Sequence, residues 1–395
     1  MLSSPFHSRT YLLCESHEWR NWSGYLAPVS YEISHEHEYY AIRNSAALID
    51  ISPLFKYEIS GPQALTLVNR IMTRDISSCA IGQMMYSPWC DDRGKVIDDG
   101  VVARLGENHF RITSADPNLA WFQDSGYGLD ATVDDISPDL AAVSLQGPNS
   151  TKVLSELMSE IELDGMKYYH LLQTRLDDFD LTVSRSGYTG DLGYELWVEA
   201  ANAERLWDLL IGVGTRFGIT PAGLASLDIA RIEAGLLLIE VDYISSRKAL
   251  IESQKSSPYE IGLGWTVDLS KCHFTGKQAL QKEHIKGSQW AFVGLEVEWA
   301  SLEALFTEVD LTPQLAGRAS RSAVPIYKDG RQIGQATSHT FSPILKRYIH
   351  LGTIQSQSAK VGNRVEVEFT VEYIRKKANA LVVKPPFFNP PRKRA

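Results

Sequence analysis

The sequence has little cysteine and no cysteine pair. Its four cysteines, Cys14, Cys79, Cys90 and Cys272, stand far apart among 395 residues, so no CxxC motif exists. Neither a zinc ribbon nor a framework of disulfides is therefore indicated. Single, separate cysteines fit reduced thiols, and we expect a cytoplasmic protein.

Long apolar runs and targeting signals are also missing. No stretch approaches the roughly 20 apolar residues that a helix needs to cross a bilayer. The first 15 residues hold neither the apolar core nor the small-residue cleavage site of a secretory signal. We therefore expect no membrane association and no secretion.

Positive charge is in deficit, since Lys and Arg total 39 against 48 Asp and Glu, a net charge of −9. An acidic surface repels a phosphate backbone, so nucleic acid is not expected as a partner. The basic run at 392–394 is a local exception that we interpret as a solvated tail. His35 and His37 form the only close histidine pair, and an exposed or structural role fits them. No metal site is predicted.

The chain is too long for one compact core, and two or three domains are expected. Strand-like and helix-like segments alternate without the regular βαβ pattern of a doubly wound sheet, which favours the α+β class. From residue 286 onward the sequence is rich in strands around an Asp329-Gly330 turn. This part is predicted to be a small β-barrel or sandwich, with the polar stretch 281–289 as the linker before it.

Apolar spacing predicts three helices. The first covers about 61–74. The second covers 202–217, where Asn202 can cap the N-terminus. The third covers about 222–234 and ends at Gly235, a natural C-terminal cap.

A pair of neighbouring aspartates is the first candidate for chemistry. Residues 90–100 have the sequence CDDRGKVIDDG, with a glycine turn before Asp98 and Asp99. On a strand these two side chains face opposite sides. One can then face a cavity while the other faces solvent or caps a turn. Taken alone, the pair is equally typical of turn aspartates.

A glycine-rich segment is the second candidate. Residues 184–196 have the sequence SRSGYTGDLGYEL, and strands are predicted on both sides of the glycines. Glycines allow unusual dihedrals and a close approach to a ligand. Tyr188 offers a flat face and a hydroxyl. Glu195 interrupts an apolar strand, so either it has a basic or ligand partner, or the segment is an ordinary hairpin that exposes it. No Lys follows in the position of a phosphate-binding loop.

An arginine in the third predicted helix completes the set. Residues 227–235 have the sequence LDIARIEAG, which places Asp228 and Arg231 one turn apart. The two can form a surface pair that contributes a few tenths of a kcal/mol. Alternatively, Arg231 points into a cavity and binds a carboxylate or a carbonyl.

Together, and in this order, the three segments resemble the glycine cleavage T-protein family. Further matching segments are QGP at 146–148, PYEIGLGW at 258–265 and TFSPIL at 340–345. The resemblance extends from about residue 31 to 384. It implies three domains in a ring around a central channel that holds tetrahydrofolate. The implied domains are a discontinuous first domain (1–52 and 140–280), an inserted domain with the catalytic aspartate (53–139) and a C-terminal β-barrel (286–395).

The resemblance also implies roles for single residues. Asp99 matches the catalytic aspartate, where it would orient N5 of the folate or manage its proton. Tyr188, Glu195 and Arg231 match folate-contacting positions. A carboxylate such as Glu195 can accept two N–H bonds from the pterin edge, and Tyr188 can pack on the pterin or its aryl linker. Arg231 can complement an oxygen or the anionic tail of the folate.

Several segments depart from the family pattern, and they concern the donor side as much as the folate side. These are Gly94-Lys95, 51–54, 111–115, 239–243 and an insertion at 244–255 of open role. The implied reaction is aminomethyl transfer, with a lipoyl carrier protein as a possible partner. Two alternatives stay open: tetrahydrofolate-dependent demethylation of a small methylated donor, and folate binding without catalysis. A cysteine motif of relatives in iron–sulfur maintenance is absent at 235–238, which argues against that role.

Overall fold

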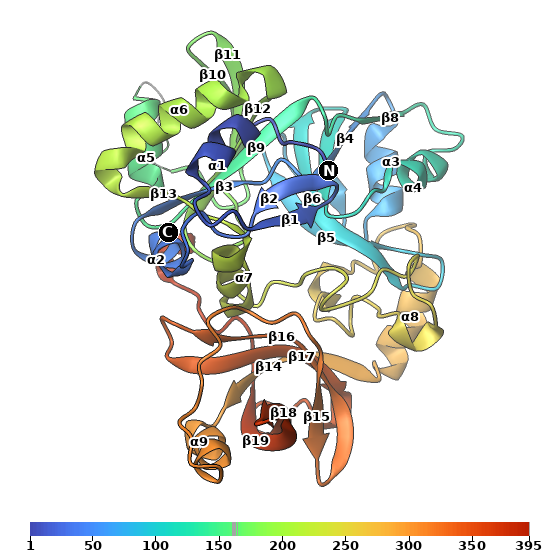
Figure 1. Ribbon diagram of the computed structural model, residues 1–395. Helices are drawn as coiled ribbons and strands as arrows, with labels where there is room; N and C mark the ends of the chain where they lie inside the picture. Colours follow the sequence, from blue (N-terminus) through green and yellow to red (C-terminus); the bar gives the residue numbers. More distant parts are fainter. Residues whose placement is uncertain (160–162, 164, 395) are drawn as a thin grey trace.

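The structure, a computed structural model, describes residues 1–159, 163 and 165–394. Its strands form three main sheets, and Figure 1 shows two of them side by side above a barrel. Helices and strands are mixed, and almost every strand pairing in the described residues is antiparallel. The predicted α+β class is therefore confirmed. No helix in this part of the chain is both long and apolar enough to cross a membrane.

A six-stranded sheet forms the centre of the first lobe, in the order β10-β11-β12-β9-β3-β13. Its strands are β3 (Ala46–Asp50), β9 (Leu140–Gln146), β10 (Leu171–Leu176), β11 (Phe179–Ser184), β12 (Gly193–Glu199) and β13 (Ile219–Pro221). One face packs against α1 (His7–Leu13), α5 (Ser150–Leu157) and α6 (Ala203–Gly214). The other face packs against α2 (Glu36–Asn44) and α7 (Leu224–Glu233), and it also carries Trp197.

A five-stranded antiparallel sheet forms the second lobe, in the order β5-β6-β7-β4-β8. Its strands are β4 (Phe55–Ser60), β5 (Met84–Cys90), β6 (Val96–Gly106), β7 (His109–Ser114) and β8 (Thr132–Asp135). Apolar residues on one face pack against α3 (Ala64–Ile71) and α4 (Leu119–Ser125). Because only this face is covered by helices of the same lobe, the opposite face is available to other parts of the chain.

The predicted C-terminal barrel is confirmed as a closed barrel with the order β14-β17-β16-β15-β18-β19. Its strands are β14 (Trp290–Val297), β15 (Val324–Lys328), β16 (Arg331–Ser342), β17 (Arg347–Gln355), β18 (Arg364–Val371) and β19 (Ile374–Val383). Helix α9 (Trp299–Thr307) packs on the barrel. Asp329 and Gly330 form the predicted turn, with φ of 50° and 74°. Positive φ at both positions suits the twist of a two-residue hairpin.

Two sequence predictions need correction, one about a helix cap and one about a linker. Asn202 precedes α6 but its side chain makes no capping hydrogen bond. The stretch 281–289 is not simply a linker, because α8 (Lys277–Lys286) covers most of it. Among the residues of α8 only Leu280 is buried, so the helix is polar on most of its surface. Because Leu280 alone is buried, the sequence lacks the apolar spacing of a packed helix and was interpreted as a linker.

The chain end was also predicted incorrectly as a solvated tail. Figure 1 shows the C-terminus beside α2, far from the barrel that precedes it. Arg392 binds the buried Asp191 with Nε–Oδ1 at 2.6 Å and donates to the Arg43 carbonyl at 2.9 Å. The tail is therefore fixed to the first lobe by a charge pair. A short hairpin of β1 (Trp19–Trp22) and β2 (Tyr25–Pro28) completes the fold. The domain boundaries given above stay a prediction.

Candidate active site

Asp99 lies on β6 with one hydroxyl donor for each carboxylate oxygen. Tyr86 donates to Oδ2 at 2.7 Å, and Tyr243 donates to Oδ1. Burial raises the pKa of Asp99, and the two hydroxyls offset part of that rise because they stabilise the charged form. The carboxylate is therefore held in one orientation by two tyrosines, one on β5 and the other in the segment after α7.

Asp98 points the other way, as predicted, and it faces the bend that follows β7 rather than solvent. It is fully buried and accepts hydrogen bonds from Asn118 Nδ2 at 2.9 Å and from the Asp116 amide at 3.1 Å. Burial, and then the charge of Asp99, raises the pKa of Asp98 well above its usual value. Of the pair, only Asp99 takes part in the candidate site, and Asp98 is part of the core behind it.

The tyrosines around Asp99 are neutral donors. Burial and then the charge of Asp99 raise the pKa of both Tyr86 and Tyr243 well above the ordinary value for tyrosine. Burial also raises the pKa of Tyr188, and the Asp99 charge contributes to that shift. Tyr188 donates to the Leu237 carbonyl, on the segment that leads to Tyr243. The charge of Asp99 thus reaches Tyr188, and the role of Tyr188 toward folate stays a prediction.

Glu195 lies on β12 and is neither fully exposed nor ion-paired. Ser186 Oγ donates to its Oε2 at 2.7 Å. Burial raises the pKa of Glu195, while Ser186 and the charge of Arg111 lower it. The alternative of an ordinary hairpin with an exposed glutamate is therefore wrong. One carboxylate oxygen has a hydroxyl partner, and a nearby guanidinium supplies the opposite charge.

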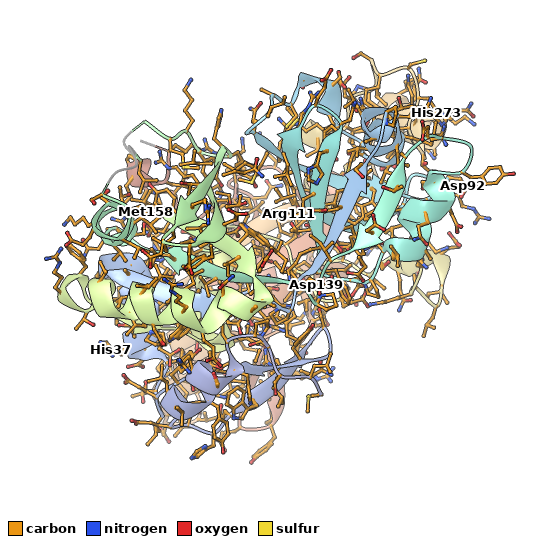
Figure 2. All side chains as sticks on the ribbon, turned by 90° about the horizontal axis from the view of Figure 1, so that it is seen from above. His37, Asp92, Arg111, Asp139, Met158 and His273 are labelled. Carbon is orange, nitrogen blue, oxygen red and sulfur yellow. The ribbon has the colours of Figure 1, made fainter. Side chains whose placement is uncertain are left out.

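Arg111 was not predicted as a site residue. Residues two apart on a strand share a face, and so do residues directly paired across strands. Tyr86 pairs with Val101, and Arg111 pairs with Ala103. Arg111 therefore shares with Tyr86 and Asp99 the face of this sheet that is opposite α3 and α4, and Figure 2 shows it between the two lobes. The sequence signal was its place in a segment that departs from the family pattern.

Arg231 is a buried member of a network rather than half of a surface pair. Its Nε donates to Asp228 at 2.8 Å, and its Nη1 donates to Asp242 at 2.6 Å and to the Leu236 carbonyl. Its Nη2 donates to Ser338 on the barrel at 2.7 Å. The surface-pair alternative is wrong: Arg231 binds carboxylates and a carbonyl, but they belong to its own chain. Its role toward folate stays a prediction.

The glycine-rich segment packs against protein at its glycines. A Cβ on Gly187 would lie 2.2 Å from Gln146 Oε1. Gly190 has φ of +73°, and a Cβ there would lie 2.4 Å from the Ala234 methyl on the end of α7. These glycines are explained by close packing on β9 and α7, rather than by approach to a ligand.

The candidate residues lie in an interior that solvent still reaches. Tyr86, Asp99, Tyr188 and Glu195 each keep part of their surface exposed. Burial is nevertheless the largest cause of every one of their pKa shifts. These side chains are therefore largely enclosed by protein and still within reach of solvent.

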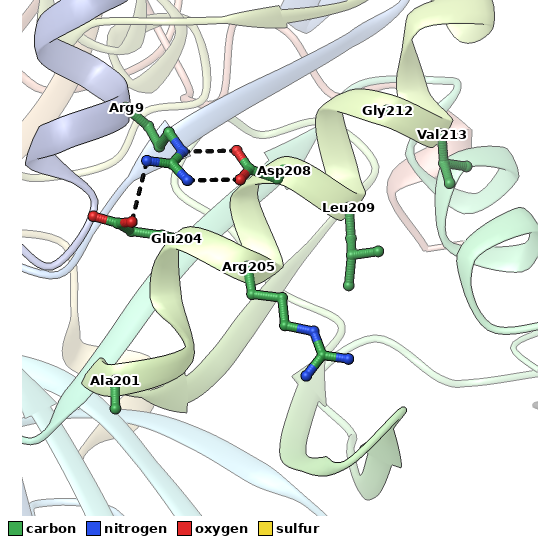
Figure 3. A pocket seen from close by; sticks show the side chains of 8 residues that line it. All are labelled: Arg9, Ala201, Glu204, Arg205, Asp208, Leu209, Gly212 and Val213. Carbon is green, nitrogen blue, oxygen red and sulfur yellow. Dashed lines mark hydrogen bonds and ion pairs between the residues drawn. The ribbon is translucent and has the colours of Figure 1, made fainter.

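A pocket on the outer surface has a different character. It has a volume of about 570 Å³ and lies between α1 and α6, and it contains none of the predicted site residues. Figure 3 shows that Arg9 on its wall is already paired with Asp208, at 2.8 Å, and with Glu204, at 3.1 Å. Its charges are therefore satisfied by each other. In the described residues, no group of three or more His, Cys, Asp or Glu side chains could hold a metal ion.

Comparisons with known proteins identify the family. The model of the GCVT N-terminal domain matches residues 14–271, and that of the glycine cleavage T-protein C-terminal barrel domain matches 309–389. The aminomethyltransferase of Desulfitobacterium hafniense (strain DSM 10664 / DCB-2) is 32% identical over 352 residues, 88% of each chain. That of Thermotoga maritima is 31% identical over 373 residues, 93% of each chain.

A solved structure has the same fold. The glycine cleavage system aminomethyltransferase T from Bartonella henselae matches with a TM-score of 0.83 and 24% identity, covering 98% of both chains. The family models cover most of this chain. The chain therefore belongs to the glycine cleavage T-protein family of transferase enzymes.

Proposed function

We propose that this chain transfers a one-carbon group to N5 of tetrahydrofolate, in the manner of an aminomethyltransferase. The observation that carries the proposal is the Asp99 carboxylate, which Tyr86 and Tyr243 hold and which solvent still reaches. A cytoplasmic location is part of the same proposal. The four free cysteines support it, since reduced thiols are usual there.

The residues present fit tetrahydrofolate. Its pterin ring is a flat heterocycle with N–H donors on one edge, and Glu195 can accept from them. Tyr188 offers an aromatic face for the ring or its aryl linker. When bound, tetrahydrofolate supplies N5 as the nucleophile that accepts the carbon. Arg231 is a further candidate for contact, although most of its N–H groups already bind Asp228, Asp242 and Ser338.

Asp99 would act as the positioning and proton-handling group. Tyr86 and Tyr243 donate to it while staying neutral, so its orientation is fixed before any ligand binds. Its pKa is raised by burial, which makes it a better proton acceptor than an exposed aspartate. Fixed geometry and a tuned pKa are what general acid–base catalysis needs.

The donor of the carbon is the finer part of the proposal. Curated relatives are named aminomethyltransferases, which favours an aminomethyl donor on a lipoyl carrier protein. Demethylation of a small methylated compound is the second candidate. It is favoured by one observation: Tyr243, which binds Asp99, comes from the segment 239–243 that departs from the family pattern. Folate binding without catalysis is the third candidate, and Asp99 argues against it.

A donor screen tests the proposal. Purified protein is incubated with tetrahydrofolate and each donor, and the folate product is identified by mass. Methylene product from an aminomethylated lipoyl carrier supports aminomethyl transfer. Methyl product from a small methylated donor supports the demethylase candidate. Bound folate that stays unconverted with every donor would favour a binding protein, and absence of folate binding would refute the proposal as a whole.

A further inference from the structure

Arg111 carries a buried positive charge without a hydrogen-bonded partner. Its side chain is nearly fully buried, and its Nε lacks any partner in the described residues. Burial lowers its pKa to about 10, which still leaves it charged at neutral pH. A buried charge without a hydrogen bond is costly, so such a group in a site indicates that a ligand supplies the missing acceptor.

Among the described residues, the neighbours of Arg111 accept no hydrogen bond from its guanidinium, so its N–H groups can donate to a ligand. The guanidinium carbon lies 4.5 Å from the centre of the Trp197 ring, which covers one face and accepts no N–H bond in the plane. Glu58 and Glu195 raise its pKa through their charges, but no ion pair joins either of them to Arg111 in the described residues. The charge of Arg111 also acts on Lys56, which donates to the Ser52 and Ser137 carbonyls.

Arg111 and Glu195 come from facing sheets. Arg111 is on β7 of the five-stranded sheet, and Glu195 shares its face of β12 with Trp197, the residue on which Arg111 stacks. One side chain is a donor and the other an acceptor, and the charge of each acts on the pKa of the other. A ligand between them would meet a donor from one lobe and an acceptor from the other.

The pterin edge has this pattern. It presents an oxygen at position 4, an N–H at position 3 and an amino group at position 2, in that order. We propose that Arg111 donates to the 4-oxo oxygen while Glu195 accepts from N3–H and the 2-amino group. This inference rests on the proposed function, and it adds Arg111 as the residue that selects a 4-oxo pterin.

A purely structural role is the alternative to weigh. Arg104 is an arginine that serves packing and has its N–H groups satisfied. Arg104, on the neighbouring strand, also stacks on a ring, that of Phe110, but it donates to the Cys79, Gly106 and Glu107 carbonyls. Arg111 has the same stacking contact without those acceptors. The difference points to a ligand, and it makes Arg104 the matched control.

Calorimetric binding tests the inference without any turnover. The probes are 5-formyltetrahydrofolate and its 4-amino-4-deoxy counterpart, which replaces the acceptor oxygen by a donor and turns N3 from a donor into an acceptor. Wild-type protein is expected to prefer the 4-oxo compound, because the counterpart loses the contact with Arg111 and one contact with Glu195. Arg111→Met, which keeps an apolar chain over Trp197, should reduce that preference by about 10- to 100-fold, the effect of one hydrogen bond to a charged group, and leave the part that Glu195 provides. Arg104→Met should keep the whole preference.

The outcomes separate the two proposals. If neither probe binds the wild-type protein, the proposed function fails. If both bind equally well to wild type, folate binding stands and the role of Arg111 is refuted. Equal weakening of both probes by Arg111→Met, with the preference intact, would also refute it and indicate a structural role. Should Arg111→Met fold poorly, Arg111→Lys is expected to retain a reduced preference, because one donor remains.

Discussion

Two buried arginines lie in different regions of this molecule and differ in how they are used. Arg231, on α7, is bound by Asp228, Asp242 and Ser338, and so joins the first lobe to the barrel. Arg111, between the two lobes, stacks on Trp197 and has no hydrogen-bonded partner for its Nε. The first region is complete without a ligand, and the second is not.

The comparison shows that burial by itself does not reveal the role of an arginine. Burial lowers the pKa of both guanidinium groups, but the nearby carboxylates raise the pKa of Arg231 overall, whereas Arg111 keeps a lowered value of about 10. Asp242 completes the first network, since it also accepts from Thr337 and Ser338 at 2.6 Å. A buried charge that is fully paired indicates architecture, and one that lacks a partner indicates a binding site.

The largest expected effect concerns catalysis at Asp99. Asp99→Asn should lower kcat by about 100- to 10,000-fold, because an amide cannot accept a proton as a carboxylate does. Folate affinity should change little. Turnover is measured with the donor found in the screen, and affinity by calorimetry. Asp91→Asn, at the turn of the same hairpin, is the control and should stay active. Unchanged turnover in Asp99→Asn would remove Asp99 from the mechanism.

The contrast between the arginines predicts different effects on stability. Arg231→Met should lower the free energy of unfolding by about 3–5 kcal/mol, because Asp242 would stay buried without its cation, while Asp228 keeps Arg321. Arg111→Met should change it by no more than about 1 kcal/mol, since the lost stacking on Trp197 is offset by the removal of an unpaired charge. Urea unfolding measures both. Similar losses in the two variants would contradict the comparison.

A ligand-binding effect of intermediate size is expected at Glu195. Glu195→Ala should weaken folate binding by about 10- to 100-fold, because the pterin edge would lose a charged acceptor. Stability should be affected much less than by Arg231→Met. Titration of 5-formyltetrahydrofolate measures the affinity, with Glu199→Ala, an exposed glutamate on the same strand, as control. Equal affinity in Glu195→Ala and wild type would refute the pterin assignment.

The smallest effect is a shift in pH dependence. Tyr243→Phe removes a hydrogen bond that stabilises the charged form of Asp99, so the pKa of Asp99 should rise further above its usual value. The ionised form is then lost at a higher pH as the solution is acidified. The acid limb of the kcat/KM profile should therefore move to higher pH, by less than about one unit. A limb that stays in place or moves down would show that Asp99 does not control it.

Much of the fold was predictable because it follows from local patterns. The α7 helix and the β15–β16 turn were predicted at nearly their observed positions, since apolar spacing and an Asp-Gly pair act over a few residues. The helix α8 was missed because one buried leucine is too weak a signal. The attachment of Arg392 to Asp191 could not be predicted, since 201 positions separate them.

The candidate site was predictable only in part. Asp99, Tyr188 and Glu195 were singled out by motifs that stand on contiguous segments. Tyr86, Arg111 and Tyr243 were not, although two of them bind Asp99 directly. Their roles depend on the register of β5, β6 and β7 and on a loop that folds back from α7, and no short segment encodes these contacts.

By itself, the sequence determined the family, the α+β class, the closed barrel and the aspartate on which the proposed chemistry rests. Periodicity and motifs are local properties, so they can be recognised in the sequence without knowledge of the fold. Only the tertiary structure decided which buried charges are paired. It placed three partners around Arg231 and left the Nε of Arg111 without one. Asp228 and Asp242 lie within 11 residues of Arg231, whereas Ser338 is 107 residues away and comes from the barrel. The fold back of the chain after α7 and the packing of the barrel against it bring these groups into contact.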